Sequence, residues 1–199
     1  MNACIFDIGN VLVRFEPGRA ERNLARLGDV SNAKAREISA LGSVYERGGL
    51  ERGEFLGRVR GILGHAGPDE DLVRAWQEMF SPNVPMWELV EKLHGKHPLY
   101  LLSNTNCLHH EYLVREYPIF EKFADGVFSY RARMSKPERG IFELAIRQFG
   151  VDPQTTAYID DLGANVEAAR AAGLLAFQYD PDAHEDLVAT LRAQGLQSV

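Results

Sequence analysis

The sequence predicts an α/β protein with a Rossmann-like parallel sheet and a small all-helical insertion after its first strand. Two observations carry this prediction. In the C-terminal half of the chain, short apolar segments alternate with helical patterns, which is typical of a parallel sheet with helices on both faces. Between the first apolar segment and the second, helical patterns follow one another without a convincing strand.

Five apolar segments are predicted to form the strands of the sheet. They are Ala3–Phe6, Leu99–Leu102, Gly126–Phe128, Thr156–Ile159 and Leu174–Tyr179. Most of them are apolar at successive positions rather than at alternating ones, which is typical of strands covered on both faces. We therefore expect helices to pack against both sides of this sheet.

Helices are predicted around the later strands. An apolar stripe spans 141–149 and ends at Gly150, a residue common after the last turn of a helix. A second helix is expected over Ala164–Ala172, where Gly173 ends it. The chain beyond Pro181 is expected to form a final surface helix.

The insertion is predicted to span residues 16–85, so that residues 1–15 and 86–199 form the core. No convincing strand occurs from about Pro17 to Pro85, and Ser81–Pro85 is expected to be a turn that returns the chain to the sheet. The four helical patterns of the insertion are Arg19–Leu27, Ala33–Leu41, Gly53–Leu63 and Glu70–Phe80.

Composition excludes several classes of protein. The 199 residues include 22 Lys and Arg against 28 Asp and Glu, for a net charge of −6. Without a basic stripe, we expect no nucleic-acid partner. Cys4 and Cys107 lie far apart and form no metal-binding pair, and no segment resembles a signal peptide or membrane span. We therefore expect a cytoplasmic protein with no membrane partner.

Polar residues follow the predicted strands where each strand ends. Asp7 follows the first strand, Ser103 begins a polar tetrapeptide after the second, Lys136 lies beyond the third, and Asp160–Asp161 ends the fourth. The carboxyl ends of parallel strands meet at one edge of the sheet. Carboxylates there suit Mg²⁺, and a lysine, a hydroxyl and backbone amides suit phosphate.

Each of these residues also has an ordinary structural explanation. An aspartate after a strand is commonly a cap or turn residue, a lysine before proline is usually solvated, and paired aspartates often form turns. Their occurrence in this order at four strand ends is what favours a binding site. A carboxylate in such a site can also act as a nucleophile.

Four motifs at these strand ends resemble those of the haloacid dehalogenase (HAD) superfamily, and the resemblance covers nearly the whole chain. The insertion resembles the small helical cap of that superfamily, including its Tyr45–Leu50 segment. Within the superfamily, the sequence is most similar to the bacterial α-D-glucose-1-phosphate phosphatase-like group. The four motifs are Phe6–Leu12, Leu101–Asn104, Ser135–Glu138 and Tyr158–Asn165.

This resemblance implies a Mg²⁺-dependent phosphatase that hydrolyses a small phosphorylated metabolite. The substrate class it implies is a sugar phosphate such as a hexose-1-phosphate. Asp7 would attack phosphorus and form an aspartyl-phosphate. The metal ligands would be Asp7, the backbone carbonyl of Gly9, and Asp161. These assignments come from the matching motif positions.

The remaining motif residues would bind phosphate or support the metal ligands. Ser103 and the Asn104 amide would bind phosphate oxygens. Lys136 would bind phosphate as well and offset the negative charge gathered there. Asp160 would orient the metal site, with Asn165 hydrogen-bonded behind it.

The chain departs from the superfamily pattern at Gly9. Most phosphatases of the superfamily carry a second aspartate there, which protonates the leaving group and then activates water. Two alternatives therefore remain open. The protein could be a metal-independent 2-haloacid dehalogenase, since those enzymes also lack the second aspartate, or a low-activity HAD-fold protein that binds a ligand or regulates a partner.

Overall fold

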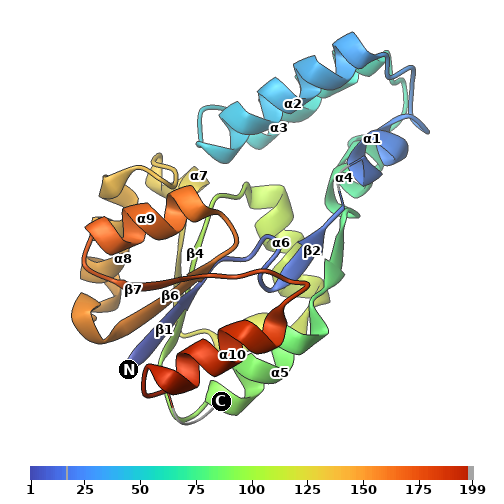
Figure 1. The fold of residues 1–199 in the computed structure, drawn as a ribbon. Coiled ribbons are helices and arrows are strands. Elements are labelled where there is room, and N and C mark those ends of the chain that lie inside the picture. Colours follow the sequence, from blue (N-terminus) through green and yellow to red (C-terminus); the bar gives the residue numbers. More distant parts are fainter. Residues whose placement is uncertain (17, 197–199) are drawn as a thin grey trace.

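A five-stranded parallel sheet forms the centre of the molecule. The computed structural model describes residues 1–16 and 18–196, so Pro17 and the last three residues assigned to the core lie outside the described part. The strand order is β5-β4-β1-β6-β7, and every neighbouring pair is parallel (Figure 1). The α/β fold predicted from the sequence is therefore confirmed. The strands are β1 (Ala3–Phe6), β4 (Leu99–Ser103), β5 (Asp125–Phe128), β6 (Thr156–Asp160) and β7 (Leu175–Gln178).

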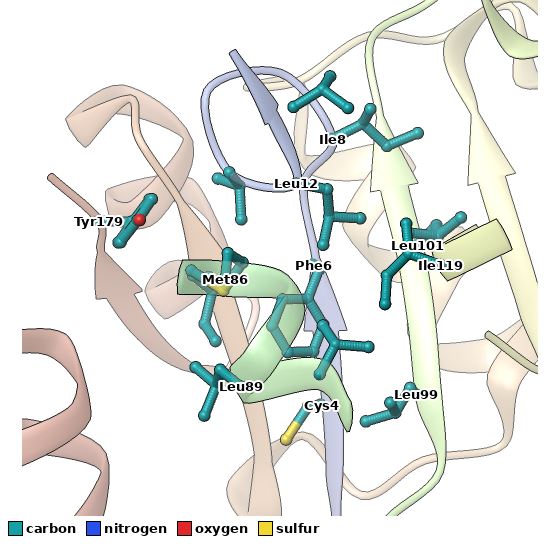
Figure 2. Close-up of a cluster of buried hydrophobic side chains, with 14 of the residues drawn as sticks. Cys4, Phe6, Ile8, Leu12, Met86, Leu89, Leu99, Leu101, Ile119 and Tyr179 are labelled. Carbon is teal, nitrogen blue, oxygen red and sulfur yellow. The ribbon is translucent and has the colours of Figure 1, made fainter. Parts of the chain in front are cut away.

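Helices cover both faces of this sheet because successive side chains of each strand point to opposite sides. On one face, Phe6 packs with α5 (Val84–Leu93) and α10 (His184–Ala193). Figure 2 shows this cluster, with Phe6 beside Met86 and Leu89 of α5. On the other face, Ile5 packs with α8 (Arg139–Phe149) and α9 (Gly163–Ala171).

Shorter helical elements lie between the strands along the chain. Helix α6 (Cys107–Glu116) begins just after β4, where the Asn106 side chain accepts a hydrogen bond from the His109 amide. This N-cap bond satisfies one of the free amides in the first turn of α6. The other connecting elements are η1 (Pro118–Lys122), α7 (Ser129–Ala132) and η2 (Pro153–Thr155).

Two short strands flank the helical insertion, which the sequence analysis did not predict. Strand β2 (Val13–Phe15) pairs antiparallel with β3 (Phe80–Pro82). The prediction that no strand occurs between residues 17 and 85 is thus wrong, as is the prediction of a turn over 81–85. Three-residue strands carry no readable periodicity, and this pair forms only when residues far apart in the chain meet.

The insertion itself is helical, as predicted. Its helices pack around their own apolar cluster, which includes Tyr45, Phe55 and Trp76. Leu108 of α6 belongs to the same cluster, so the insertion is anchored on the core. No helix within the described ranges is long and apolar enough to cross a membrane. The insertion helices are α1 (Arg19–Leu24), α2 (Asn32–Glu46), α3 (Arg52–Leu63) and α4 (Asp69–Gln77).

The boundaries of the insertion, placed by the sequence at residues 16 and 85, remain a prediction. Helices α2 and α3 lie side by side as a hairpin, and their connecting loop approaches α7 (Figure 1). This arrangement places the C-terminal end of α2 over the carboxyl edge of the sheet. We use "cap" below for α1 to α4 and their connecting loops.

Candidate functional site

The predicted site residues meet at the carboxyl edge of the sheet. A cavity of about 250 Å³ opens there. Of the predicted residues, only Asp160 does not line it, because this side chain is fully buried behind the others. Those that do line it are Asp7, Gly9, Ser103, Asn104, Lys136, Asp161 and Asn165.

Asp7 is positioned directly after β1, where its backbone amide donates to the Ile159 carbonyl of β6 at 2.9 Å. Its Oδ1 accepts the Ile8 amide at 2.7 Å and lies 2.8 Å from Lys136 Nζ. Burial raises the pKa of Asp7 to about 6, against the opposing effect of the Lys136 charge. Both contacts use Oδ1, so among the described residues no donor occupies Oδ2 of Asp7, and Asp7 lines the cavity.

Lys136 is the only cation among the described residues that line this cavity. Its Nζ lies 2.8 Å from Asp7 Oδ1 and 2.7 Å from Asp160 Oδ2. Burial alone would lower the pKa of Lys136, but the two carboxylates outweigh that effect and raise it. The lysine therefore stays charged at neutral pH and holds two carboxylates together.

The Asn104 side chain fixes the backbone of Lys136. Asn104 Oδ1 accepts the Lys136 amide at 2.8 Å, and Asn104 Nδ2 donates to the Lys136 carbonyl at 2.9 Å. This paired contact joins the loop after β4 to the loop that carries the lysine. The sequence predicts only the backbone amide of Asn104 as a binding group, and the contact of its side chain with the Lys136 backbone appears only in the structure.

Asp160 is surrounded by hydrogen-bond donors. Its Oδ1 accepts the Leu162 amide at 2.8 Å and Asn165 Nδ2 at 3.0 Å, and its Oδ2 accepts the Tyr158 hydroxyl. These donors and the Lys136 ammonium lower the pKa of Asp160, although burial acts to raise it. Because both oxygens are occupied, this side chain suits the supporting position predicted for it rather than a ligand position.

Asp161 has a different environment. Its Oδ2 accepts Asn10 Nδ2 at 3.0 Å, and the residue lines the cavity. Burial raises the pKa of Asp161, although the Asn10 hydrogen bond acts to lower it. Asn10 adopts a left-handed backbone conformation with φ 52°, and its Oδ1 accepts the Phe15 amide of β2 at 3.2 Å. Asn10 thus connects Asp161 to the strand pair below the cap, a role the sequence analysis did not assign.

The donor set fits a hard divalent cation. Oxygens of Asp7, Asp160 and Asp161 all lie within 4.8 Å of one another. Of these, Asp7 and Asp161 line the cavity, and so does Gly9, whose carbonyl comes from the same loop as Asp7. Mg²⁺ binds through few carboxylates and keeps several waters, so such a small oxygen set suits it.

Ser103 ends β4 and is buried, with 2% of its surface exposed. Its hydroxyl makes only a long contact, 3.5 Å, to the adjacent Asn104 carbonyl. That leaves the hydroxyl free to turn toward a ligand.

Nearby His109 is also buried. Burial lowers the pKa of His109 to about 4, so the ring is neutral at neutral pH. The ring stacks on Trp76 of the cap and contacts the Trp76 carbonyl at 3.1 Å, so it helps the cap pack on the core.

Two further residues at the site escaped the sequence analysis. Tyr158, two positions before Asp160 on β6, lies on the same side of the strand, and the period of two could have indicated its contact. Glu46 lines the cavity from the cap. Glu46 belongs to the cap-like Tyr45–Leu50 segment, but the sequence does not place it at the site, because it reaches the site only through the docking of α2.

Comparisons with known proteins find related sequences. The profile of the haloacid dehalogenase-like hydrolase family matches residues 1–173. The chain is 25% identical to a D-ribitol-5-phosphate phosphatase of Bacteroides thetaiotaomicron, covering 87% of this chain and 89% of that protein. It is 26% identical to a sesquiterpene phosphatase of Aspergillus oryzae, with 87% of each chain covered.

A solved structure gives a further similarity. A HAD family enzyme of Bacteroides thetaiotaomicron, crystallised with magnesium and inorganic phosphate, superposes with a TM-score of 0.83 at 26% identity. The match covers 91% of this chain and 95% of that one. The fold described above therefore has a structural counterpart in that enzyme.

Proposed function

Since the chain belongs to the haloacid dehalogenase-like hydrolase family, we propose that it is a Mg²⁺-dependent phosphatase of a small phosphorylated metabolite. The observation that carries the proposal is the position of Lys136. Its Nζ lies within 2.8 Å of both the Asp7 and the Asp160 carboxylates, and the second oxygen of Asp7 accepts no hydrogen bond from the part of the chain that the structure describes. A phosphate that enters here meets a cation, a free nucleophile and hydrogen-bond donors.

The proposed reaction begins with Asp7. Its free oxygen attacks phosphorus, the bond to the leaving oxygen breaks, and an aspartyl-phosphate forms. Ser103 and the Asn104 amide bind the phosphate oxygens, and Lys136 offsets their charge. Mg²⁺, held by Asp7, the Gly9 carbonyl and Asp161, would supply the positive charge that lets a carboxylate approach a phosphate dianion.

The support from relatives concerns phosphate chemistry. Two curated relatives are phosphatases, and a solved relative was crystallised with magnesium and phosphate. Asp160 and Asn165 would keep the metal ligands oriented, as their mutual hydrogen bonds at 3.0 and 3.1 Å suggest. These contacts favour a phosphatase over a metal-independent dehalogenase, which has no use for an oriented pair of aspartates.

For the substrate, we propose a sugar phosphate such as a hexose-1-phosphate. The cavity of about 250 Å³ is smaller than most drug-sized sites, which favours a compact leaving group. A relative named for a sugar-alcohol phosphate is in keeping with this class. The sesquiterpene phosphatase among the relatives makes a terpenoid phosphate the natural competitor in a substrate panel.

The test is phosphate release from a panel of sugar, sugar-alcohol and terpenoid phosphates, with Mg²⁺ and with chelator. We expect Mg²⁺-dependent release that is lost in Asp7→Asn and is fastest with sugar phosphates. Release no greater than in Asp7→Asn would overturn the phosphatase proposal. Halide release from 2-haloacids in the presence of chelator would instead identify a dehalogenase, and tight phosphate binding without turnover would identify a ligand-binding protein.

A further inference from the structure

The site lacks a general acid and base on the loop after β1, where Gly9 takes the place of an aspartate. The structure shows that the backbone does not require glycine there. A Cβ built on Gly9 meets nothing within 4 Å, and Gly9 is not among the glycines with positive φ. The space for a carboxylate exists, yet this chain leaves it empty.

A different carboxyl group lines the same cavity. Glu46, the last residue of α2, lies at the cavity from the cap side and is the only carboxylate that the cap contributes among the described lining residues. The apolar and aromatic side chains of the same lining are Ile8, Phe15, Phe80, Leu113 and Leu162.

The Glu46 carboxyl has no hydrogen bond or ion pair with any other residue in the described ranges. Burial raises the pKa of Glu46 to about 7, and no neighbouring charge contributes to the shift. A group in this state is half protonated near neutral pH and can give up or accept a proton. The titratable residues that line its two adjoining cavities are Asp7, Glu21, His109, Lys136 and Asp161.

Two contacts hold this end of α2 on the core. The Ser129 hydroxyl donates to the Glu46 carbonyl at 2.6 Å and accepts the Thr105 amide at 2.9 Å. The next residue, Arg47, pairs with Glu138 at 3.0 Å. Glu46 is thus tied by its own backbone to the loops that carry Ser103 and Lys136, and Figure 1 shows this end of α2 above α7.

Gly48 extends the same contact. It has φ 68°, and a Cβ there would lie 2.3 Å from the Tyr130 carbonyl of α7. Only glycine permits this close approach in this conformation. The segment that follows Glu46 therefore lies directly against α7, which fixes the end of α2 beside the cavity that Asp7 also lines.

We propose that Glu46 is the general acid and general base of the reaction, in place of the aspartate absent at Gly9. This inference rests on the phosphatase proposed above. It moves the proton-transfer group from the nucleophile loop to the cap. Proton transfer then depends on the docking of the cap on the core, so that water reaches an acid and base only when the cap is seated.

The proton balance of the two steps follows. In the first, Asp7 bonds to phosphorus, the leaving oxygen takes the electron pair of the broken bond, and protonated Glu46 gives it a proton to form the alcohol. In the second, water attacks the aspartyl-phosphate, and Glu46, now a carboxylate, takes a proton from it. The bond to Asp7 breaks, phosphate leaves, and both side chains return to their starting states.

The test compares leaving groups in Glu46→Gln. An alkyl or sugar phosphate needs a proton on its leaving oxygen, whereas p-nitrophenyl phosphate does not. For the alkyl or sugar phosphate, we expect kcat/KM to fall about 10²- to 10⁴-fold. For p-nitrophenyl phosphate we expect kcat/KM within a few-fold of wild type, a burst of one nitrophenol per enzyme, and slow turnover afterwards as the aspartyl-phosphate accumulates.

Two further measurements separate proton transfer from a structural role. In the wild type, kcat/KM for the alkyl phosphate should fall as the pH rises through about 7, and this limb should disappear in Glu46→Gln. The double variant Gly9→Asp/Glu46→Gln should have a kcat/KM for the alkyl phosphate at least tenfold higher than that of Glu46→Gln, since an aspartate fits at position 9. Glu37→Gln, an exposed residue on the same helix, is the matched control.

The outcomes are distinct. Equal losses for both leaving groups, with the pH limb retained, would assign Glu46 a structural role and overturn the inference. Losses below threefold for both would also overturn it, while leaving the phosphatase proposal intact. If the wild type releases no phosphate from any substrate, both the phosphatase proposal and the role of Glu46 are overturned. If the wild type is active and Glu46→Gln is equally active, only the role of Glu46 is overturned.

Discussion

Replacing Lys136 by methionine tests the electrostatic design of the site. The Lys136 side chain is 1% exposed, and its ammonium lies 2.8 Å from Asp7 and 2.7 Å from Asp160. Methionine keeps most of the volume but leaves two buried carboxylates without their cation. Removing one partner of a buried ion pair costs about 3–5 kcal/mol, so the unfolding equilibrium constant should rise roughly two hundred- to several thousand-fold near pH 7.5.

The penalty should depend on pH in a defined direction. The pKa of Asp7 in the folded protein is about 6, above its unfolded value of 3.8, so ionising Asp7 already destabilises the wild type as the pH rises between those values. Without Lys136, Asp7 stays protonated to a higher pH. As the pH rises by roughly 1.5 units, from about 6 to about 7.5, the free energy of unfolding changes by about 1.4 kcal/mol per unit. Over this range the variant therefore loses about 2 kcal/mol more stability than the wild type.

The assay is urea denaturation with chelator present, at about pH 5 and about pH 7.5, for the wild type and Lys136→Met. For Lys136→Met at the higher pH, we expect the free energy of unfolding to fall by about 3–5 kcal/mol relative to wild type. At the lower pH, this loss should be smaller by about 2 kcal/mol. The exposed Lys96→Met serves as the control and should change stability by a few tenths of a kcal/mol at both. A loss below 1 kcal/mol, or one equal at both pH values, would refute this account of the site.

Three other substitutions probe the same contacts. Near pH 7.5 and without Mg²⁺, Asp7→Asn should raise the free energy of unfolding by about 1–3 kcal/mol while abolishing phosphate release, because it removes a buried carboxylate with a raised pKa; a less stable variant in denaturation would contradict this. Gly48→Ala should lower kcat/KM at least tenfold and lower Tm, since its Cβ would lie 2.3 Å from a backbone oxygen of α7, whereas Gly57→Ala, whose Cβ meets nothing within 4 Å, should keep kcat/KM. Asn104→Ala removes two hydrogen bonds to the Lys136 backbone and should cost about 1–3 kcal/mol in denaturation and lower kcat more than KM; unchanged stability and kcat would show that these bonds do not position the lysine.

The central sheet could be predicted because its signal is local. Each strand is a short apolar segment, and each ends at a polar residue, so Ala3–Phe6 agrees with β1 at both ends and the others agree to within a residue or two. The strand pair β2 and β3 could not be found in this way. Its three-residue strands become strands only by pairing with each other across the whole insertion.

The site was predicted in its composition but not in its contacts. A motif places Asp7, Lys136 and Asp161 at strand ends, and parallel topology brings such ends together. Which oxygen each donor occupies depends on side-chain positions that no spacing encodes. The hydrogen bonds from Asn104 to the Lys136 backbone and from Asn10 to Asp161 are examples, and they determine which carboxylate oxygens remain free for a ligand.

The sequence by itself determined the parallel sheet, the helical insertion and the identity of the charged residues at one edge. These depend on the order of apolar and polar residues along the chain, which acts over a few positions. Only the tertiary structure decided that Glu46 lines the nucleophile's cavity, because that position depends on packing of α2 against α7 and on hydrogen bonds from Ser129. Burial then raises the pKa of the Glu46 carboxyl, and burial is a property of the assembled fold rather than of any segment.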